Sequence, residues 1–345
     1  MNDESVPTGP LVGLKVLELA HLVAGPMAGS LMADLGADVV HVEAPGIGDP
    51  ARRSGPTKDG VPLWWKVGAR NKRSVTIDLR TESGQQLARR LATWADVVIT
   101  NFRPTTLEGW GLDHSALHTV NPLIITLQLS AFGATDPGRD RAGFGKIGEA
   151  MSGAAFLTGD RSGPPVLAGY LLSDAVAALM GVVAVEAALY RRAQHEKFDG
   201  EWIDIALFEP LFRMIDWQVI AHDQLGVVPE RAGAGSMMAE SSLVDTALTG
   251  DGEWIVVSCG TERALHGAAV VAGGSAALED RADLVRSLTE WIGDHATDEC
   301  IAVLSDAGVS ASRVYSMADI VADPIYAARG NITTVDDPEL GPIRM

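Results

Sequence analysis

Apolar residues in the first part of the chain fall into two alternating patterns. Short continuous runs predict buried β-strands, and segments in which apolar residues recur every three or four positions predict helices. Strands are expected at 15–19, 38–43, 74–79, 96–100 and 123–130, and helices at 26–35 and over the stripe Leu87, Leu91 and Trp94. This alternation indicates an α/β fold with a parallel sheet covered by helices on both faces. Ligands of such sheets bind at the carboxyl ends of the strands.

The rest of the chain predicts further helices and a second, smaller region. A loop rich in Gly, Arg and Asp leads into a helix near Met151, and a long apolar helix follows over 174–192. After a turn at 199–200, the segment 201–210 begins as a strand and continues as a helix. The turn at 250–252 then precedes another strand and more helical patterns, which predict a smaller α/β domain.

Composition and charge exclude several classes of protein. The chain has 27 Lys and Arg against 45 Asp and Glu, a net charge of -18, which disfavours a nucleic-acid partner because a phosphate backbone needs a basic face. The apolar content of 47% predicts a compact globule. Cys259 and Cys300 lack the spacing of a metal or redox motif, so they are expected to be buried thiols. The N-terminus lacks the pattern of an export signal, and Asp174 and Glu186 interrupt the longest apolar segment, so we expect a cytoplasmic protein without a membrane segment.

The turn after the first expected strand reads AHLVAGPMAG and invites comparison with dinucleotide-binding loops. Gly25 and Gly29 give the spacing G-x-x-x-G instead of G-x-G-x-x-G, so the sequence disfavours NAD and predicts no redox cofactor. The free backbone N–H groups at the start of the next helix nevertheless suit a nucleotide or CoA phosphate. On pattern alone, a strand-to-helix turn that binds no ligand is an equal alternative.

Basic residues gather where loops are expected at the ends of strands. Taken singly, each is explained as a solvated surface charge, whereas together they predict a binding site for one polyanionic ligand such as a nucleotide. The groups are Arg52 with Arg53, Asn71 with Lys72 and Arg73, and Asn101 with Phe102 and Arg103.

Asp174 lies at the expected start of the long apolar helix and has two interpretations. As a helix cap, its carboxylate would accept backbone N–H bonds. As a nucleophile in an apolar pocket, it would form an acyl intermediate that is protected from water. The sequence contains no G-x-S-x-G elbow, H-E-x-x-H helix or P-loop, so serine hydrolase, zinc protease and P-loop ATPase chemistry lack their signatures, and no metal is expected.

Four blocks in order along nearly the whole chain resemble the class III CoA-transferase family, which includes formyl-CoA transferase and related acyl-CoA racemases. The blocks read LVGLKVLELAHLVAGPMAGSLMADLGADVVHVEAPGIGDPAR, NKRSVTIDLRTESGQQLARRL, ADVVITNFRPTTLEGWGL and DAGVSASRVYSMADIVADPIYAARG. The resemblance implies a large Rossmann-like CoA-binding domain at 1–220, a linker with a small α/β domain at 221–325, and an interlocked homodimer. It also implies that 326–345 begin a segment that returns to the large domain and that the chain continues past Met345.

The resemblance also implies a reaction and a set of site residues. CoA would pass from an acyl-CoA donor to a carboxylate acceptor, with Asp174 as the nucleophile that forms a mixed anhydride and then an aspartyl-CoA thioester. The residues expected to bind CoA are His21, Val23 and Ala24 along its channel, Asn71, Lys72 and Arg73 at its nucleotide end, and Asn101, Phe102 and Arg103 elsewhere along the coenzyme.

Two alternatives remain at this stage. An acyl-CoA racemase needs a second proton-transfer group, but Phe144 stands where the racemases carry a histidine, which favours the transferase. A CoA-binding protein without turnover would use Asp174 only as a helix cap. Two departures limit the resemblance to formyl-CoA transferase: Val23 replaces a glutamine, and a glycine-rich lid is reduced to Gly233 and Gly235. Val23, Trp64 and Trp65 suggest a larger, less polar acyl group.

Overall fold

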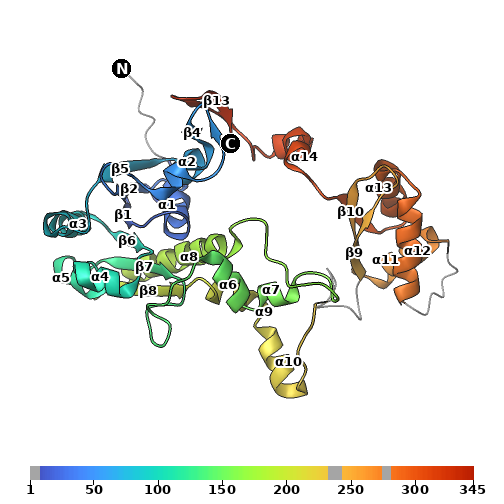
Figure 1. Ribbon diagram of the computed structural model, residues 1–345, viewed down its shortest axis with the longest axis horizontal. Helices are drawn as coiled ribbons and strands as arrows, with labels where there is room; N and C mark the ends of the chain where they lie inside the picture. Colours follow the sequence, from blue (N-terminus) through green and yellow to red (C-terminus); the bar gives the residue numbers. More distant parts are fainter. Residues whose placement is uncertain (1–7, 232–242, 274–280) are drawn as a thin grey trace. The chain divides into compact units, whose positions relative to one another are not determined.

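The computed structural model describes residues 8–231, 243–273 and 281–345, so Gly233 and Gly235 of the expected lid lie outside the described residues. The chain divides into two compact units (Figure 1). The large unit holds the chain up to Ala155 together with Leu167–Val227 and Pro338–Gly341, and the small unit holds Phe156–Val166, Val228–Asp337 and Pro342–Met345.

A six-stranded parallel sheet forms the centre of the large unit, which confirms the predicted α/β fold. The strands lie in the order β5-β2-β1-β6-β7-β8, so the order of connection reverses between β1 and β6, as in doubly wound nucleotide-binding folds. Their bounds are β1 Lys15–Leu19, β2 Asp38–Glu43, β5 Lys72–Thr76, β6 Val97–Thr100, β7 Ile125–Ser130 and β8 Glu201–Ala206.

Helices bury both faces of this sheet because successive strand residues point to opposite sides. Val16 belongs to the core beneath α1 and α8, whereas Leu17 belongs to the core beneath α3, α4 and α5. The helices are α1 Ala24–Asp34, α3 Glu82–Trp94, α4 Pro104–Trp110, α5 His114–Val120 and α8 Leu172–Gln194.

Helix α8 is long and apolar enough to cross a membrane by length and composition alone. Its inner face is nevertheless part of the protein core, where Ala177, Val182 and Val185 are buried against the sheet. Gly181 allows close approach, since a Cβ there would lie 2.9 Å from the Leu127 side chain. These contacts are those of a core helix in an α/β domain.

Shorter elements complete the large unit. They include the 3-10 helix η1 at Pro50–Arg53, the hairpin of β3 Thr57–Lys58 and β4 Val61–Pro62, α2 Leu63–Gly68, α6 Gly145–Met151, α9 Glu209–Ile215 and α10 Trp217–Leu225. Helix α7 covers Ala154–Leu157.

The small unit contains an antiparallel sheet in the order β11-β10-β9, with its own hydrophobic core against three helices. Cys259 and Cys300 are free, buried thiols in this core, as predicted. The elements are β9 Leu243–Leu248, β10 Trp254–Cys259, α11 Glu262–Val271, α12 Arg281–Gly293, α13 Thr297–Asp306 and β11 Ser310–Arg313. The chain continues with α14 Met317–Ala322, α15 Pro324–Ala328 and the paired strands β12 Thr334–Asp337 and β13 Gly341–Arg344.

Two predicted boundaries are wrong in ways that affect the site. The strand expected at 74–79 is β5, which begins at Lys72 and ends at Thr76, because its first residues pair with β2 from Val39 onward. The long helix begins at Leu172 instead of Asp174. Asp174 is therefore the third residue of α8, and Leu171, without a side-chain cap, takes the N-cap position.

Candidate active site

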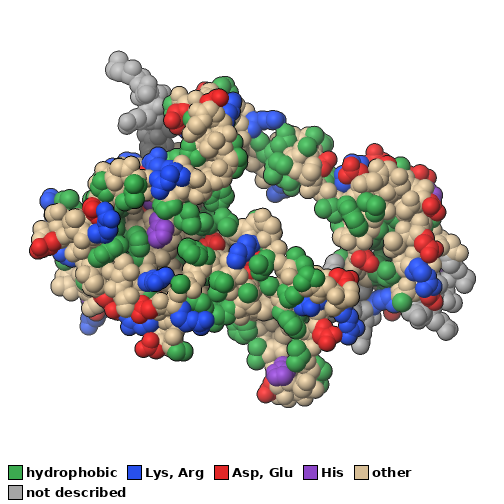
Figure 2. Space-filling view, in the orientation of Figure 1, with side chains coloured by type: hydrophobic (Ala, Val, Ile, Leu, Met, Phe, Trp, Pro, Cys, Tyr) green, Lys and Arg blue, Asp and Glu red, His purple; other side chains and the backbone are tan. Residues whose placement is uncertain are grey.

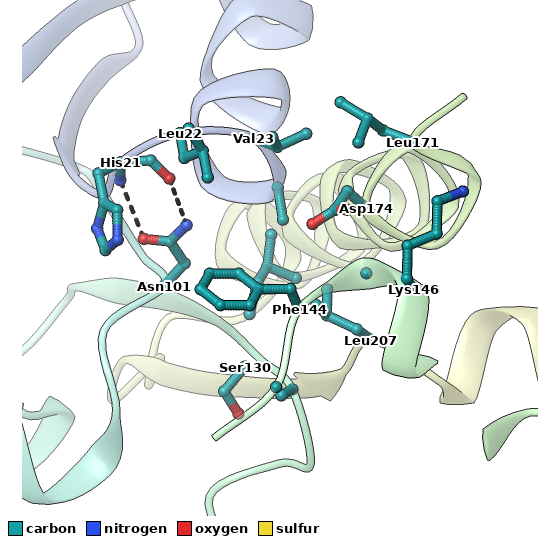
Figure 3. A pocket seen from close by; sticks show the side chains of 15 residues that line it. His21, Leu22, Val23, Asn101, Ser130, Phe144, Lys146, Leu171, Asp174 and Leu207 are labelled. Atoms are coloured by element: carbon teal, nitrogen blue, oxygen red, sulfur yellow. Dashed lines mark hydrogen bonds between the residues drawn. The ribbon is translucent and has the colours of Figure 1, made fainter. Parts of the chain in front are cut away.

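A cavity of about 230 Å³ opens at the carboxyl ends of β1, β6 and β7, beside the point where the strand order reverses (Figure 3). Such a switch point is the usual binding crevice of an open parallel sheet. The cavity is lined by residues 21–24 after β1, Asn101 after β6, residues 129–131 at the end of β7, residues 143–146 at the start of α6, Leu171, Asp174 and Leu207. The predicted residues His21, Val23, Ala24, Asn101 and Asp174 thus lie around one space.

Asp174 is the acidic side chain of this cavity lining. It exposes only 9% of its surface, and its carboxylate points into the cavity beside Phe144 (Figure 3). Burial raises its pKa to about 6, and the negative charge of Glu149 adds to this effect, while Lys146 opposes it. Asp174 does not hold the N-cap position, which Leu171 takes, and a bond to the carboxylate from its own backbone N–H also opposes the rise in pKa.

Two glycines of α6 allow the close approach of α6 and the first turn of α8. A Cβ at Gly145 would lie 1.9 Å from Oδ2 of Asp174, and a Cβ at Gly148 would lie 2.4 Å from Oγ of Ser173. Ser173 in turn donates a hydrogen bond to the carbonyl of Leu207, at 2.6 Å. The position of the Asp174 carboxylate therefore depends on the missing side chain of Gly145.

An ion pair between the half-exposed Lys146 and the buried Glu149 ties α6 to the segment before α8. Lys146 Nζ lies 2.7 Å from Oε1 of Glu149 and also donates to the carbonyls of Ala168, at 2.6 Å, and Tyr170, at 2.7 Å. The second oxygen of Glu149 accepts from the Ala168 N–H at 3.0 Å. Because Lys146 is engaged in this way, it holds the chain around Asp174 in place instead of neutralising the carboxylate directly.

The loop after β1 is clamped by Asn101. Its Oδ1 accepts from the His21 N–H at 3.0 Å, and its Nδ2 donates to the His21 carbonyl at 2.7 Å (Figure 3). The His21 ring packs against Phe102 at 4.9 Å, and burial lowers the pKa of His21, so the ring is neutral at pH 7. Leu22 follows with a φ of 70°, a left-handed conformation that is rare outside glycine.

A second cavity, of about 300 Å³, adjoins the first because His21 lines both. It lies at the carboxyl ends of β1, β2 and β5, and Phe102 forms part of its wall. Its lining also includes the cations Arg53 and Arg80 and the carboxylates of Glu43, Asp49 and Asp78, beside the apolar Ile47, Ile77, Leu79 and Trp110.

The remaining predicted cofactor residues do not line either cavity. The expectation that 71–73 follow a strand is wrong, since Lys72 and Arg73 open β5, at the amino end of the sheet. Asn71 bonds Asp34 at 2.9 Å and Arg73 bonds Asp38 at 2.6 Å. Lys72 is buried against Glu18, and Arg103 is the exposed N-cap residue of α4.

Of the three bulky residues that were expected to shape the acyl site, only one lines the cavity of Asp174. Val23 lines the cavity of Asp174, whereas Trp64 and Trp65 are not part of its lining. The guanidinium of Arg52 lies 4.0 Å from the centre of the Trp65 ring. Sequence reasoning missed Gly145, Leu22 and Asp49; for Gly145, the glycines three residues apart at the start of a helix were the available signal.

A doubly wound sheet with a buried carboxylate at its switch point defines an α/β enzyme site that is suited to acyl transfer. The chain belongs to CoA-transferase family III, whose model matches residues 11–345, and it is a CoA-transferase of that class. It is 38% identical to a succinyl-CoA:D-citramalate CoA-transferase of Chloroflexus aurantiacus, over 98% of this chain and 87% of the relative.

Two further comparisons agree with this assignment. A succinate:glutarate CoA-transferase of Agrobacterium fabrum is 34% identical over 93% of this chain and 84% of its own length. The crystal structure of a CaiB/BaiF family protein from Brucella suis superposes with a TM-score of 0.84 and 34% identity, covering 97% of this chain and 90% of that one. The predicted family and fold are thus confirmed.

Proposed function

We propose that the protein transfers CoA from an acyl-CoA thioester to a free carboxylic acid, with Asp174 as the covalent carrier. The observation that carries this proposal is the burial of the Asp174 carboxylate in a cavity at the switch point of the sheet. A pKa of about 6 leaves Asp174 mostly ionised at pH 7 and more basic than an ordinary carboxylate, as a nucleophile requires.

The reaction consists of paired substitutions at carbonyl carbon. Asp174 attacks the thioester carbonyl of the donor and the C–S bond breaks. CoA leaves as a thiolate, and the donor acyl group stays on Asp174 as a mixed anhydride. The thiolate attacks the Asp174 carbonyl, which releases the donor acid and forms an aspartyl-CoA thioester. The acceptor carboxylate attacks the carbonyl of this thioester, the C–S bond breaks, and a second mixed anhydride forms between the acceptor and Asp174. The released thiolate attacks the acceptor carbonyl of that anhydride, which gives the new acyl-CoA and regenerates the Asp174 carboxylate. A site with little water protects both intermediates from hydrolysis.

The two adjoining cavities support one placement of the coenzyme. The nucleotide end would occupy the cavity beside Phe102, where Arg53 offers positive charge to the phosphates and Arg80, which is paired with Asp78, could exchange that partner for them. The pantetheine arm would then pass His21 and bring the thioester to Asp174. Contacts of Asn71, Lys72, Arg73 and Arg103 with CoA stay predictions.

The names of the relatives support short dicarboxylic acids as substrates. Both curated relatives described above are named for succinyl-CoA or succinate, with D-citramalate or glutarate as the partner acid. We therefore propose succinyl-CoA as the first donor to test. Phe144, which lines the cavity, cannot carry a proton, so the site offers no support for a racemase at this position.

A homodimer is also proposed. Hydrophobic side chains reach the surface of the large unit in several places (Figure 2). On α8, the exposed fractions of Leu179, Val183 and Tyr190 are 50%, 59% and 70%, which is unusual for a single helix of a globular domain. Sedimentation of the purified protein at micromolar concentration tests the number of chains.

Exchange of labelled succinate into succinyl-CoA tests the covalent role of Asp174. We expect Asp174→Asn to abolish exchange while CoA binding persists. In the wild type, hydroxylamine should attack the aspartyl-CoA thioester, release CoA and leave a hydroxamate on Asp174. The control is Asp204→Asn, another carboxylate with a raised pKa, which accepts from the Ala134 N–H at 2.8 Å outside the cavity lining. Exchange that survives in Asp174→Asn would refute the nucleophile.

A further inference from the structure

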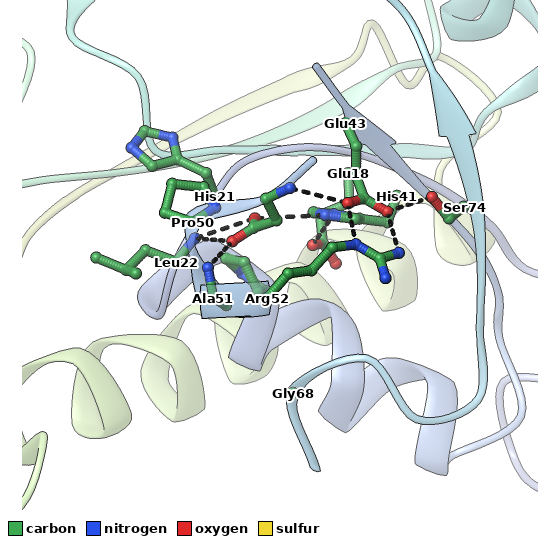
Figure 4. Close-up of polar contacts among 12 residues, drawn as sticks. Glu18, His21, Leu22, His41, Glu43, Pro50, Ala51, Arg52, Gly68 and Ser74 are labelled. Atoms are coloured by element: carbon green, nitrogen blue, oxygen red, sulfur yellow. Dashed lines mark hydrogen bonds and ion pairs between the residues drawn. The ribbon is translucent and has the colours of Figure 1, made fainter. Parts of the chain in front are cut away.

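A cluster of charged side chains is buried behind the loop that lines the Asp174 cavity (Figure 4). It consists of Glu18 on β1, His41 on β2, Asp49 before η1 and Lys72 on β5, whose side chains are at most 3% exposed. Charges are rarely buried so completely without paired contacts, because they lose their hydration. None of these four residues lines the Asp174 cavity.

His41 is the centre of this cluster. Its Nδ1 lies 2.6 Å from Oε1 of Glu18, and its Nε2 lies 3.4 Å from Oδ2 of Asp49; both are ion-pair contacts without hydrogen-bond geometry. The other oxygen of Glu18 lies 2.8 Å from Nζ of Lys72, which also donates to the carbonyl of Pro26 at 2.5 Å. With His41 protonated, two cations balance two carboxylates, whereas a neutral His41 leaves one buried negative charge unbalanced.

The other groups that face His41 are few. The Trp65 ring of α2 lies 5.8 Å away, and His21 on the loop after β1 contributes a weak repulsion between the two rings. Burial by itself lowers the pKa of His41, but the contacts with Asp49 and Glu18 outweigh burial and the repulsion from Lys72, and raise the pKa to about 9. The imidazolium is therefore the dominant form at pH 7.

Asp49 connects this cluster to the cavity. Both of its carboxylate oxygens lie 3.2 Å from the N–H of Leu22, and Oδ1 also accepts from the Ala51 N–H at 2.6 Å (Figure 4). Leu22 has the left-handed φ of 70° and lines the cavity together with Asp174. A conformation of this kind persists only when neighbouring groups hold it.

We propose that His41, held as an imidazolium between Glu18 and Asp49, is a positioning residue of the transfer reaction. It fixes the Asp49 carboxylate, Asp49 holds the N–H of Leu22, and the loop thereby keeps the shape that forms one wall of the Asp174 cavity. This inference rests on the proposed function, because the wall matters only where acyl-CoA reacts. His41 lines neither cavity, whereas Asp49 lines the second one, so His41 acts on the site through Asp49.

We expect activity to fall at alkaline pH because His41 loses its proton. As pH rises through about 9, His41 loses its proton, Asp49 loses its cation, and kcat/KM for succinyl-CoA should fall reversibly. His41→Gln should lower kcat/KM about tenfold at pH 7.5, chiefly through kcat. Its kcat/KM should no longer fall as the pH rises through about 9. His114→Gln, a half-buried histidine beside Thr126 on the opposite face of the sheet, should keep the wild-type profile.

A second variant separates positioning from general damage to the fold. Leu22→Gly removes the need for an external clamp, since glycine adopts a positive φ freely. In the Leu22→Gly background, His41→Gln should therefore lower kcat/KM by a smaller factor than it does in the wild type. Equal losses in both backgrounds, or an alkaline limb that persists in His41→Gln, would overturn the proposal.

Titration of the histidine ring gives a readout that does not depend on turnover. In NMR spectra of histidine-labelled protein, the resonance that disappears in His41→Gln should titrate near pH 9. A midpoint at or below the ordinary value of about 6.5 would refute the inference even if transferase activity were never found. Loss of exchange in Asp174→Asn tests the proposed function separately, so the two failures can be told apart.

Discussion

The large unit buries carboxylates in two contrasting environments. Asp174 faces a cavity with no cation in direct contact among the described residues, and burial raises its pKa to about 6. Glu43 exposes only 3% of its surface, yet bonds from Arg52, Ser74 and the Asp49 N–H outweigh burial and lower its pKa to about 2. The comparison shows that burial alone does not set the chemistry of an acid in this fold. The presence or absence of a partner decides between a structural charge and a reactive one.

The largest expected effect comes from adding one methyl group at residue 145, beside the carboxylate of Asp174. In Gly145→Ala the new Cβ would overlap Oδ2 of Asp174, so the carboxylate must rotate out of line with the thioester. We expect kcat for succinate exchange to fall about a hundredfold or more. Gly109→Ala in α4, where a Cβ meets nothing within 4 Å, is the matched control. Wild-type turnover in Gly145→Ala would contradict the geometry of the site.

A second test removes the partner from a paired acid. Arg52→Ala leaves the Glu43 carboxylate, which is 2% exposed, without its guanidinium, so we expect about 2 kcal/mol less stability at pH 7 in urea unfolding. The folded pKa of Glu43 is below its ordinary value, so its stabilisation is complete above pH 4.5 and is lost as pH falls through about 2. The loss of stability in Arg52→Ala should therefore become smaller as the pH falls over that range. Arg90→Ala, which removes an exposed arginine, is the control and should lose no stability.

A third test, of similar size, concerns the free energy of unfolding, which the ionised Asp174 carboxylate lowers. Because the folded pKa of Asp174 is above its ordinary value of 3.8, ionisation destabilises the folded state at neutral pH. Asp174→Asn should therefore be roughly 2 kcal/mol more stable than the wild type at pH 7.5. The gain should disappear below about pH 4, where the wild-type side chain is protonated in both states. A variant less stable than the wild type at pH 7.5 would show that Asp174 has a stabilising partner.

Much of the large unit could be predicted from the sequence because its central strands are buried on both faces and therefore read as continuous apolar runs. Strand β5 was misplaced because it is an edge strand that begins with charged residues, whose acidic partners on other elements cannot be seen in sequence. Asp174 stands out in the sequence as an acid at the start of an apolar helix, and the family resemblance favours its role as nucleophile, whereas Gly145 depends on a contact between two helices. The buried cluster has one signal in the sequence, because Glu18 and His41 interrupt two otherwise apolar strands.

The contact between Gly145 and Asp174 restricts how the substrate range of this protein can be redesigned. Enlarging or refilling the acyl site by substitution has to spare residue 145, because any side chain there competes with the nucleophile for the same volume. Phe144, the adjacent residue, is 69% exposed and lines the same cavity, so it can be exchanged for smaller or polar side chains without that conflict. A library built at 144, with 145 left untouched, is the natural starting point for new acyl specificities.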